Sequence, residues 1–307
     1  MTTLVTTVTE TLRYRGKLGQ WSWVLHRIAG LGTLLFLVIH TVDTSWVYFY
    51  PELYERAIQI YQTPLFTLGE FALVACVVYH AFNGLRITLF DYRPEWWEHQ
   101  ALAAQVVLLA TAVVLVPVFV LMGQHVVEFY SGRPFDLGLG PVITDVALPF
   151  GGGMVAVLVL GVVLSAAWGA VSGSRGAAGP FLAQRSRFEQ LMWSFMRVSG
   201  VLLVVLALGH LAIMHVINGV FDINQGGQFG QAANFVAGRW AFLFWRLYDA
   251  ALLALAMIHG FNGFRYVIND YVHHPTVRRG LHWAIIAGAV ITIGMGSIAL
   301  INGVPGS

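Results

Sequence analysis

Two histidines lie in nearly identical surroundings far apart in this sequence. His80 begins the segment His-Ala-Phe-Asn-Gly-Leu-Arg, His259 begins His-Gly-Phe-Asn-Gly-Phe-Arg, and each segment is followed at the same distance by Asp-Tyr. Both fall inside long apolar stretches, where an ionisable side chain is costly and is therefore a candidate for function. Because imidazole nitrogens are common metal ligands, the two histidines predict a site for a metal-containing cofactor.

A second pair of histidines follows the same pattern. Arg27 begins Arg-Ile-Ala-Gly, Arg197 begins Arg-Val-Ser-Gly, and a histidine stands thirteen residues after each arginine, at His40 and His210. Two independent blocks in the same order in both halves indicate an internal repeat.

The composition indicates that the repeats lie in a membrane. Of the 307 residues, 57% are hydrophobic and only 10% are charged, whereas a soluble domain has about a quarter of charged residues. A helix needs about 20 mostly apolar residues to span a bilayer. Seven stretches qualify, which predicts an all-α integral membrane protein: Val24–Tyr48, Leu65–Phe90, Ala101–Met122, Gly152–Val171, Phe195–Val220, Phe242–Ile268 and Leu281–Ile301.

The basic residues are unevenly distributed about these spans. With seven spans, 13 of the 17 Lys and Arg residues fall on the side of the N-terminus and 4 on the other side. Because basic loops tend to face the cytoplasm, we expect a multi-pass protein of the inner (cytoplasmic) membrane with a cytoplasmic N-terminus. No basic stripe indicates nucleic acid, and the single Cys76 cannot hold an iron–sulfur cluster.

Spans and repeats together predict the organisation of the chain. Residues 1–123 hold three spans of the first repeat, residues 191–307 hold three spans of the second, and residues 124–190 hold one crossing span. The crossing span returns the chain to its starting side, so the repeats are parallel rather than inverted as in many transporters. Equivalent residues of parallel repeats lie at equal depth.

Depth along the helices decides which histidines pair. At about 1.5 Å per residue, His80 and His259 lie roughly 17 Å from the Asp-Tyr end of their helices, and His40 and His210 lie about 20 Å beyond their arginines. Each pair therefore joins two helices at matched depth, as a haem with two imidazole ligands in a four-helix core requires. We predict two b-type haems, an inner one on His80 and His259 and an outer one on His40 and His210.

Plainer interpretations exist for single residues. A lone histidine in a membrane helix can serve as an interhelical hydrogen-bonding group, and His215 is an alternative to His210. Four glycines near the histidines are expected to make room for a flat macrocycle: Gly30, Gly84, Gly200 and Gly263. The remaining histidines near helix ends are expected to be solvated, among them His26, His99, His273, His274 and His282.

These motifs resemble the membrane-anchor cytochrome b of succinate:quinone oxidoreductases (complex II) and of fumarate reductases. The first repeat is similar to the larger anchor subunit, through His-Arg-x-x-Gly at 26–30 and Tyr-His-x-x-x-Gly-x-Arg at 79–86. The second repeat is similar to the smaller anchor subunit, through Arg197 and His-x-x-x-Gly at 259–263. Over about six of seven spans, the chain resembles a fusion of the two anchors of the dihaem type.

The resemblance implies a function and partners. The four histidines would be axial haem ligands, and a flavoprotein subunit and an iron–sulfur subunit would dock on the cytoplasmic face. Electrons would then pass to a membrane quinone, menaquinone or ubiquinone. Single-chain dihaem members of the family have five helices, so seven is a departure. The sequence leaves the oligomeric state open.

The resemblance also implies a quinone site where the anchor meets the iron–sulfur subunit. Trp23 stands in the register of the family's serine, and Ser22 is one residue out of it. Tyr and Arg can donate hydrogen bonds to quinone oxygens as charge develops on them, although the arginines could instead bind haem propionates or lipid headgroups. With repeat mates included, the candidates are Ser22, Trp23, Arg27, Asp91, Tyr92, Arg197, Asp270 and Tyr271.

Two acids have repeat-related positions of their own. Glu70 and Asp249 each stand ten residues before an inner histidine. They could relay protons, border a second quinone site, or face water at the interface. For the whole chain, the alternative function is a haem-free anchor or a transporter-like structural subunit.

Overall fold

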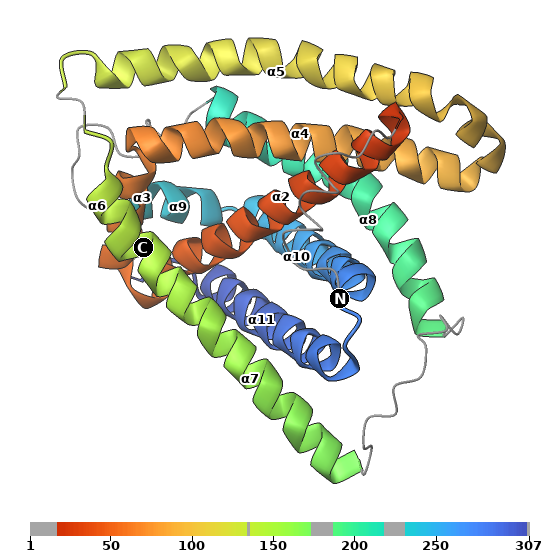
Figure 1. Cartoon of the computed structure of the whole chain (residues 1–307). Helices are drawn as coiled ribbons and strands as arrows, with labels where there is room; N and C mark the ends of the chain where they lie inside the picture. The colour runs from red at the N-terminus through yellow and green to blue at the C-terminus, as the bar shows by residue number, and fades with distance from the viewer. Residues whose placement is uncertain (1–16, 134–135, 173–186, 218–230, 306–307) are drawn as a thin grey trace.

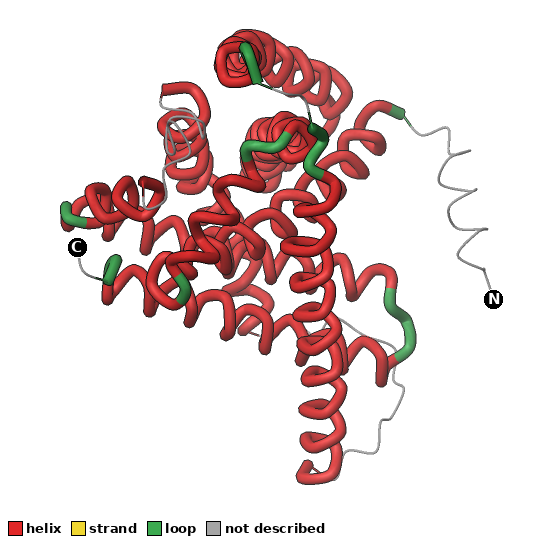
Figure 2. Tube along the Cα trace, turned by 90° about the vertical axis from the view of Figure 1, so that its left-hand side faces the viewer, coloured by secondary structure: helices red, strands yellow, loops and turns green. Residues whose placement is uncertain are grey.

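The structure is a computed structural model that describes residues 17–133, 136–172, 187–217 and 231–305, and the regular structure within these ranges is helical (Figure 2). Seven helical segments there are long and apolar enough to cross a membrane, which confirms the predicted fold class. They are α2 (Leu18–Phe49), α4 (Pro64–Tyr92), η1 (Pro94–His99) with α5 (Gln100–Tyr130), α6 (Leu139–Pro141) and η2 (Val142–Ala147) with α7 (Leu148–Ser172), α8 (Arg187–Leu211) with η3 (Ala212–Ile217), α10 (Leu243–Tyr271) and α11 (Pro275–Asn302).

The helices extend beyond the apolar stretches from which they were predicted. Proline occupies the first position of α4 and α11, where its missing N–H costs no helical hydrogen bond and its fixed φ suits the first turn. The α2 helix begins at Leu18, six residues before the predicted start at Val24. The last residues of the predicted span Phe195–Val220 lie outside the described residues.

Four helices form a closed ring, two from each repeat. In the ring α2 packs against α4, α4 against α8, α8 against α10, and α10 against α2. The third helix of each repeat lies outside this ring, α5 beside α4 and α2, and α11 beside α10 and α2. In Figure 1, α5 runs along the top of the molecule. We call the end of the ring that carries Asp91 and Asp270 the inner end, and the opposite end the outer end.

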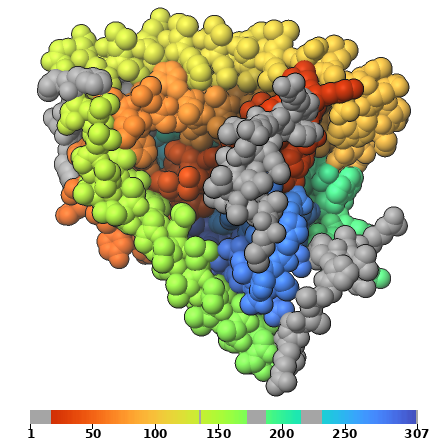
Figure 3. All heavy atoms as spheres, viewed as in Figure 1, coloured from red at the N-terminus to blue at the C-terminus, as the bar shows by residue number. Residues whose placement is uncertain are grey.

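The crossing helix α7 lies at the periphery, where it packs mainly against α11 (Figures 1 and 3). The two backbones approach closely at Gly161, because a Cβ atom there would stand 2.5 Å from the backbone nitrogen of Ala284. Only glycine fits at such a contact.

Two short helices close the outer end of the ring. The α3 helix (Pro51–Tyr61) connects the first two spans of the first repeat, and α9 (Gln231–Trp240) occupies the same place in the second. They pack against each other, and the buried Glu55 of α3 accepts a hydrogen bond from the backbone N–H of Ala233 in the first turn of α9. Their lengths are too short to span a membrane, so a search for spans could not find them.

The core beneath these two helices is an apolar cluster with one polar pair beside it. Apolar side chains of α3 and α9 meet the outer ends of α2 and α11 in one cluster: Val47, Tyr54, Ile58, Ala232, Val236, Trp240, Ala299 and Leu300. Next to it, the hydroxyl of Tyr61 donates to the buried carboxyl of Asp43 on α2. Burial and this neighbouring carboxyl raise the pKa of Tyr61, so its phenol stays protonated and remains a donor.

Replacing Gly161 by alanine should loosen the packing of α7 on α11. We expect a loss of about 1–3 kcal/mol, typical of overpacking a tight contact, seen as a lower midpoint of thermal unfolding in detergent. Gly169 on the same helix is the control, because a Cβ there meets nothing within 4 Å. Gly169→Ala should leave the midpoint unchanged or raise it slightly, since alanine favours the helix. Equal midpoints for the two variants would contradict the close approach.

Candidate functional site

The inner histidines face each other across the ring. His80 of α4 and His259 of α10 have ring centres 6.3 Å apart, with their planes at 86°. Since α4 and α10 occupy one diagonal of the ring, the contact joins the two repeats through its middle. The structure therefore brings together the inner pair that matched depth predicted.

The outer histidines lie on the other diagonal. His40 of α2 and His210 of α8 have ring centres 6.1 Å apart, with planes at 66°, and Phe36 stacks on His40 at 5.4 Å. Each repeat thus contributes one histidine to each pair. The side chain of His215, the alternative to His210, lies outside the described side chains.

Both pairs have the spacing that one shared metal ion requires. An imidazole–metal bond is about 2 Å long, so two imidazoles on opposite sides of a metal have ring centres about 6 Å apart. In the described part of the chain, no three His, Cys, Asp or Glu side chains gather as a metal site. A pair of imidazoles suits a haem, because the porphyrin supplies the remaining ligands.

The inner rings are held by hydrogen bonds at their Nδ1 atoms. Nδ1 of His80 lies 3.1 Å from the carbonyl oxygen of His26, and Nδ1 of His259 lies 2.9 Å from the hydroxyl of Ser199. Metal-binding histidines are commonly oriented in this way through the nitrogen that does not bind the metal.

His26 is a direct neighbour of the inner pair. It stacks on His80, with ring centres 4.0 Å apart and planes only 4° apart, and its Nδ1 atom is buried. The expectation of a solvated histidine at a helix end was wrong because α2 begins at Leu18, two turns earlier. Its place directly before Arg27 in the repeated block was the signal that could have identified it.

Of the repeated glycines around the histidines, Gly30 has a direct steric role. A Cβ atom on Gly30 would lie 2.7 Å from Cε1 of His80, and one on Gly200 would lie 3.5 Å from Cε1 of His259. Likewise, Gly84 lies against the ring of His26. Gly30 therefore makes room for the ring of His80, whereas a Cβ atom on Gly84 or Gly200 would make only an ordinary van der Waals contact.

Two ion pairs connect the repeats at the inner end. Arg27 of α2 pairs with Asp270 of α10, and Arg197 of α8 pairs with Asp91 of α4, with nitrogen–oxygen distances of 2.5 and 3.0 Å in the second pair. Because Arg27 and Arg197 are repeat mates, as are Asp91 and Asp270, the two pairs are equivalent and reciprocal. Each fastens the first helix of one repeat to the second helix of the other.

Aromatic residues complete two equivalent clusters around these pairs. The guanidinium of Arg27 lies 3.9 Å from the ring centre of Trp23 and 5.8 Å from that of Tyr271. The guanidinium of Arg197 lies 4.3 Å from the ring centre of Trp193, which in turn contacts Tyr92 at 6.1 Å. We call these the Arg27 cluster (Trp23, Arg27, Asp270 and Tyr271) and the Arg197 cluster (Asp91, Tyr92, Trp193 and Arg197).

The two clusters differ in how far their donors are used. Arg197 makes two bonds to Asp91 and a third to the carbonyl of Trp193. Arg27 bonds Asp270 through Nη2, while its buried Nη1 has no hydrogen-bond partner among the described residues. Ser22, the other candidate beside Trp23, is buried and directs its hydroxyl to Asn83, 2.8 Å away.

The first repeat also holds a second arginine with unused donors. Arg86 is buried, and its Nε and Nη1 atoms have no partner in the described ranges. Its repeat mate Arg265 is paired instead with both oxygens of Glu189, at 2.6 and 2.9 Å. Unpaired buried donors cost free energy unless a ligand satisfies them, so the inner end of the first repeat is suited to an acceptor-bearing ligand.

The chain matches the family described as succinate dehydrogenase/fumarate reductase transmembrane subunit over residues 6–119 and 180–296, more than half of its length. The chain belongs to this family. A similar protein is the succinate dehydrogenase 2 membrane subunit SdhC of Mycobacterium tuberculosis, which is 36% identical over 135 residues, 42% of this chain and 99% of that protein. The protein is therefore a multi-pass membrane anchor subunit of a succinate dehydrogenase or fumarate reductase.

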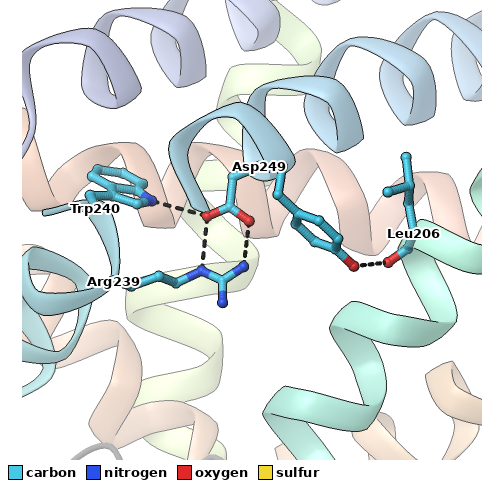
Figure 4. Close-up of polar contacts among 5 residues, drawn as sticks. Leu206, Arg239, Trp240 and Asp249 are labelled. Carbon is cyan, nitrogen blue, oxygen red and sulfur yellow. Dashed lines mark hydrogen bonds and ion pairs between the residues drawn. The ribbon is translucent and has the colours of Figure 1, made fainter. Parts of the chain in front are cut away.

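At the outer end of this membrane subunit, Asp249 has a structural partner. Its carboxylate accepts two bonds from Arg239, at 2.6 and 2.9 Å, and one from the indole N–H of Trp240, at 3.1 Å (Figure 4). Both donors belong to α9, so the carboxylate fastens that helix to α10. Glu70, its repeat mate, is partly buried.

Asp249→Asn should destabilise this anchor subunit. The substitution leaves Arg239 unpaired, and breaking a largely buried pair costs roughly 3–5 kcal/mol. We expect a lower midpoint of thermal unfolding, with the succinate dehydrogenase or fumarate reductase activity per folded complex unchanged.

The matched control is Asp145→Asn, which removes a pair with the more exposed Arg56 (61% of its side chain) and should cost under about 1 kcal/mol. An unchanged midpoint in Asp249→Asn together with lost quinone activity would favour a proton relay instead.

Proposed function

We propose that this anchor subunit holds two b-type haems and passes electrons from an iron–sulfur subunit to membrane quinone. The observation that carries the proposal is the pairing of histidines on both diagonals of the ring, at 6.3 and 6.1 Å. His80 and His259 would bind the inner haem, and His40 and His210 the outer haem.

When bound, each haem iron accepts and releases one electron, and the chain's own residues set the conditions for that step. The two diagonals hold the imidazoles at two depths of one ring. The helices around them supply an apolar environment, and the first repeat's arginines supply positive charge at the inner end.

The unpaired donors of the first repeat support an inner haem. A haem bears carboxylate side chains, and Nε and Nη1 of Arg86 and Nδ2 of Asn83 are buried donors in need of acceptors. Asn83 and Arg86 stand three and six residues after the proposed ligand His80 on the same helix, α4. Charge-assisted bonds from arginine to carboxylate are among the strongest hydrogen bonds in proteins.

For the quinone, the Arg27 cluster is the better of the two candidate sites. Its arginine keeps an unused N–H, and Tyr271 is 58% exposed, so both can donate to a quinone oxygen as negative charge develops on it. In the Arg197 cluster each of the three guanidinium nitrogens already donates a bond, to Asp91 or to the carbonyl of Trp193. We infer that the Arg197 cluster fastens the repeats together and that menaquinone or ubiquinone binds at the Arg27 cluster.

The proposed partners follow from the family and from the charge distribution. The excess of basic residues on the side of the N-terminus, which includes the inner end, supports a cytoplasmic position for that side. A flavoprotein subunit and an iron–sulfur subunit would dock there, next to the Arg27 cluster. We also propose that residues 1–123 and 191–307 act as the two anchors and residues 124–190 as their connection.

Haem analysis of the purified complex tests the proposal. Two b haems per chain are expected by pyridine haemochrome assay. His80→Ala should remove one haem and His40→Ala the other, because each variant removes one ligand of one pair and leaves the other pair intact.

If the wild-type complex shows no haem absorbance, the alternative function, a haem-free anchor, is correct. Loss of both haems from His40→Ala in a complex that still assembles would contradict separate sites.

Tyr271→Phe should lower quinone-reductase activity about 10- to 100-fold, the loss expected when one hydrogen bond to a charge-bearing oxygen is removed. The control is the repeat mate Tyr92→Phe, which loses the same hydroxyl from a side chain of nearly equal exposure, 57% against 58%. Tyr92→Phe should retain wild-type activity, and both variants should retain haem. Equal losses would mean that the two clusters are not functionally distinct.

A further inference from the structure

We propose that Ser199 is a positioning residue for the inner haem, because its hydroxyl fixes the proton of His259 on Nδ1 and so keeps Nε2 available as the iron ligand. The inference rests on the proposed ligation of haem by His80 and His259.

Ser199 is placed for this role by α8. It is 1% exposed, and its Oγ lies 2.6 Å from the carbonyl oxygen of Phe195 one turn earlier on the same helix. The same Oγ lies 2.9 Å from Nδ1 of His259 on α10. The serine therefore stands between a backbone acceptor and the imidazole.

The number of protons in this chain of bonds determines the tautomer. A carbonyl oxygen can only accept, so the one hydroxyl proton of Ser199 is directed to Phe195. Oγ of Ser199 is then the acceptor in its bond with His259, so Nδ1 of His259 must carry a proton and donate it to Oγ. A neutral imidazole protonated at Nδ1 has its lone pair on Nε2, where a metal can bind.

The opposite ligand reaches the same state by another route. Nδ1 of His80 faces the carbonyl oxygen of His26 at 3.1 Å, and a carbonyl again can only accept. Both inner imidazoles thus present Nε2. The residue that matches Ser199 in the first repeat is Ala29, so the repeats solve the same problem with a side chain in one half and the backbone in the other.

This difference lets Ser199 affect the reduction potential of the inner haem. A hydrogen bond accepted from Nδ1–H makes the imidazole a stronger donor through Nε2 and stabilises the oxidised iron. Removing the acceptor should weaken iron binding and favour the reduced state. His80 carries no such replaceable group, because its acceptor belongs to the main chain.

Ser199→Ala in the assembled complex tests the role. We expect the midpoint potential of the inner haem to move positive, the g-values of its ferric low-spin EPR signal to shift, and its affinity to fall by roughly 10- to 100-fold. The outer haem in the same sample should keep its potential and serves as the internal reference. Ser199→Thr, which keeps the hydroxyl, should restore the wild-type values.

Ser45→Ala is the matched control. Ser45 is also 1% exposed, and its hydroxyl donates to the carbonyl of Thr41 one turn earlier, at 2.5 Å. Among the described residues it makes no bond to a histidine ring, so the variant loses the same kind of helical bond without touching a proposed ligand. Its inner haem should be indistinguishable from that of the wild type.

Unchanged potential, EPR signal and haem retention in Ser199→Ala would overturn the positioning role while leaving the haem proposal intact. The haem proposal itself would be contradicted by a different result, namely no inner haem in the wild type or an unaltered spectrum in His80→Ala. If Ser199→Ala does not assemble, Ser199→Cys takes its place. With its weaker sulfur acceptor it must shift the potential positive by a smaller amount, and a wild-type potential there would equally overturn the role.

Discussion

The constraint on which the rest of this structure depends is that polar groups within a bilayer must find partners inside the protein. Here the repeats satisfy one another. Arg27 of the first repeat pairs with Asp270 of the second, and Arg197 of the second pairs with Asp91 of the first. The same exchange brings one histidine from each repeat to both diagonals of the ring. Equal depth, which parallel repeats guarantee, is what allows every one of these contacts to form between equivalent helices.

The two repeats share one arrangement of helices but differ in which arginine N–H groups lack a hydrogen-bond partner. Arg265 is satisfied by Glu189 and Arg197 by Asp91, whereas Arg86 and Arg27 of the first repeat keep buried N–H groups without partners among the described residues. One half has therefore retained the donors that a ligand needs, while in the other the same positions hold the bundle together. Because the unpaired donors belong to the first repeat, a ligand that accepts hydrogen bonds should bind on the side of that repeat.

The sequence predicted the spans and the histidine pairs because both depend on periodicity and depth, which a single chain displays directly. It could not distinguish Tyr271 from Tyr92, because the two tyrosines differ in whether the neighbouring arginine has an N–H group without a partner. That depends on packing. Ser199 and Trp193 also escaped notice, because a serine inside an Arg-x-x-Gly block and a tryptophan at a helix end are common. His26 was misplaced by an error of a few residues in the start of α2. The short helices α3 and α9 lacked the length by which spans are recognised.

The peripheral position of α7 has a consequence for how the molecule assembles. This helix packs mainly against α11 and takes no place in the ring, so the histidine pairs and the two ion pairs that link the repeats are made by the two halves that it joins. A covalent connection of this kind raises the effective concentration of one half near the other. Closure of the ring becomes an intramolecular step whose extent does not depend on expression level, and the two halves are always made in equal number.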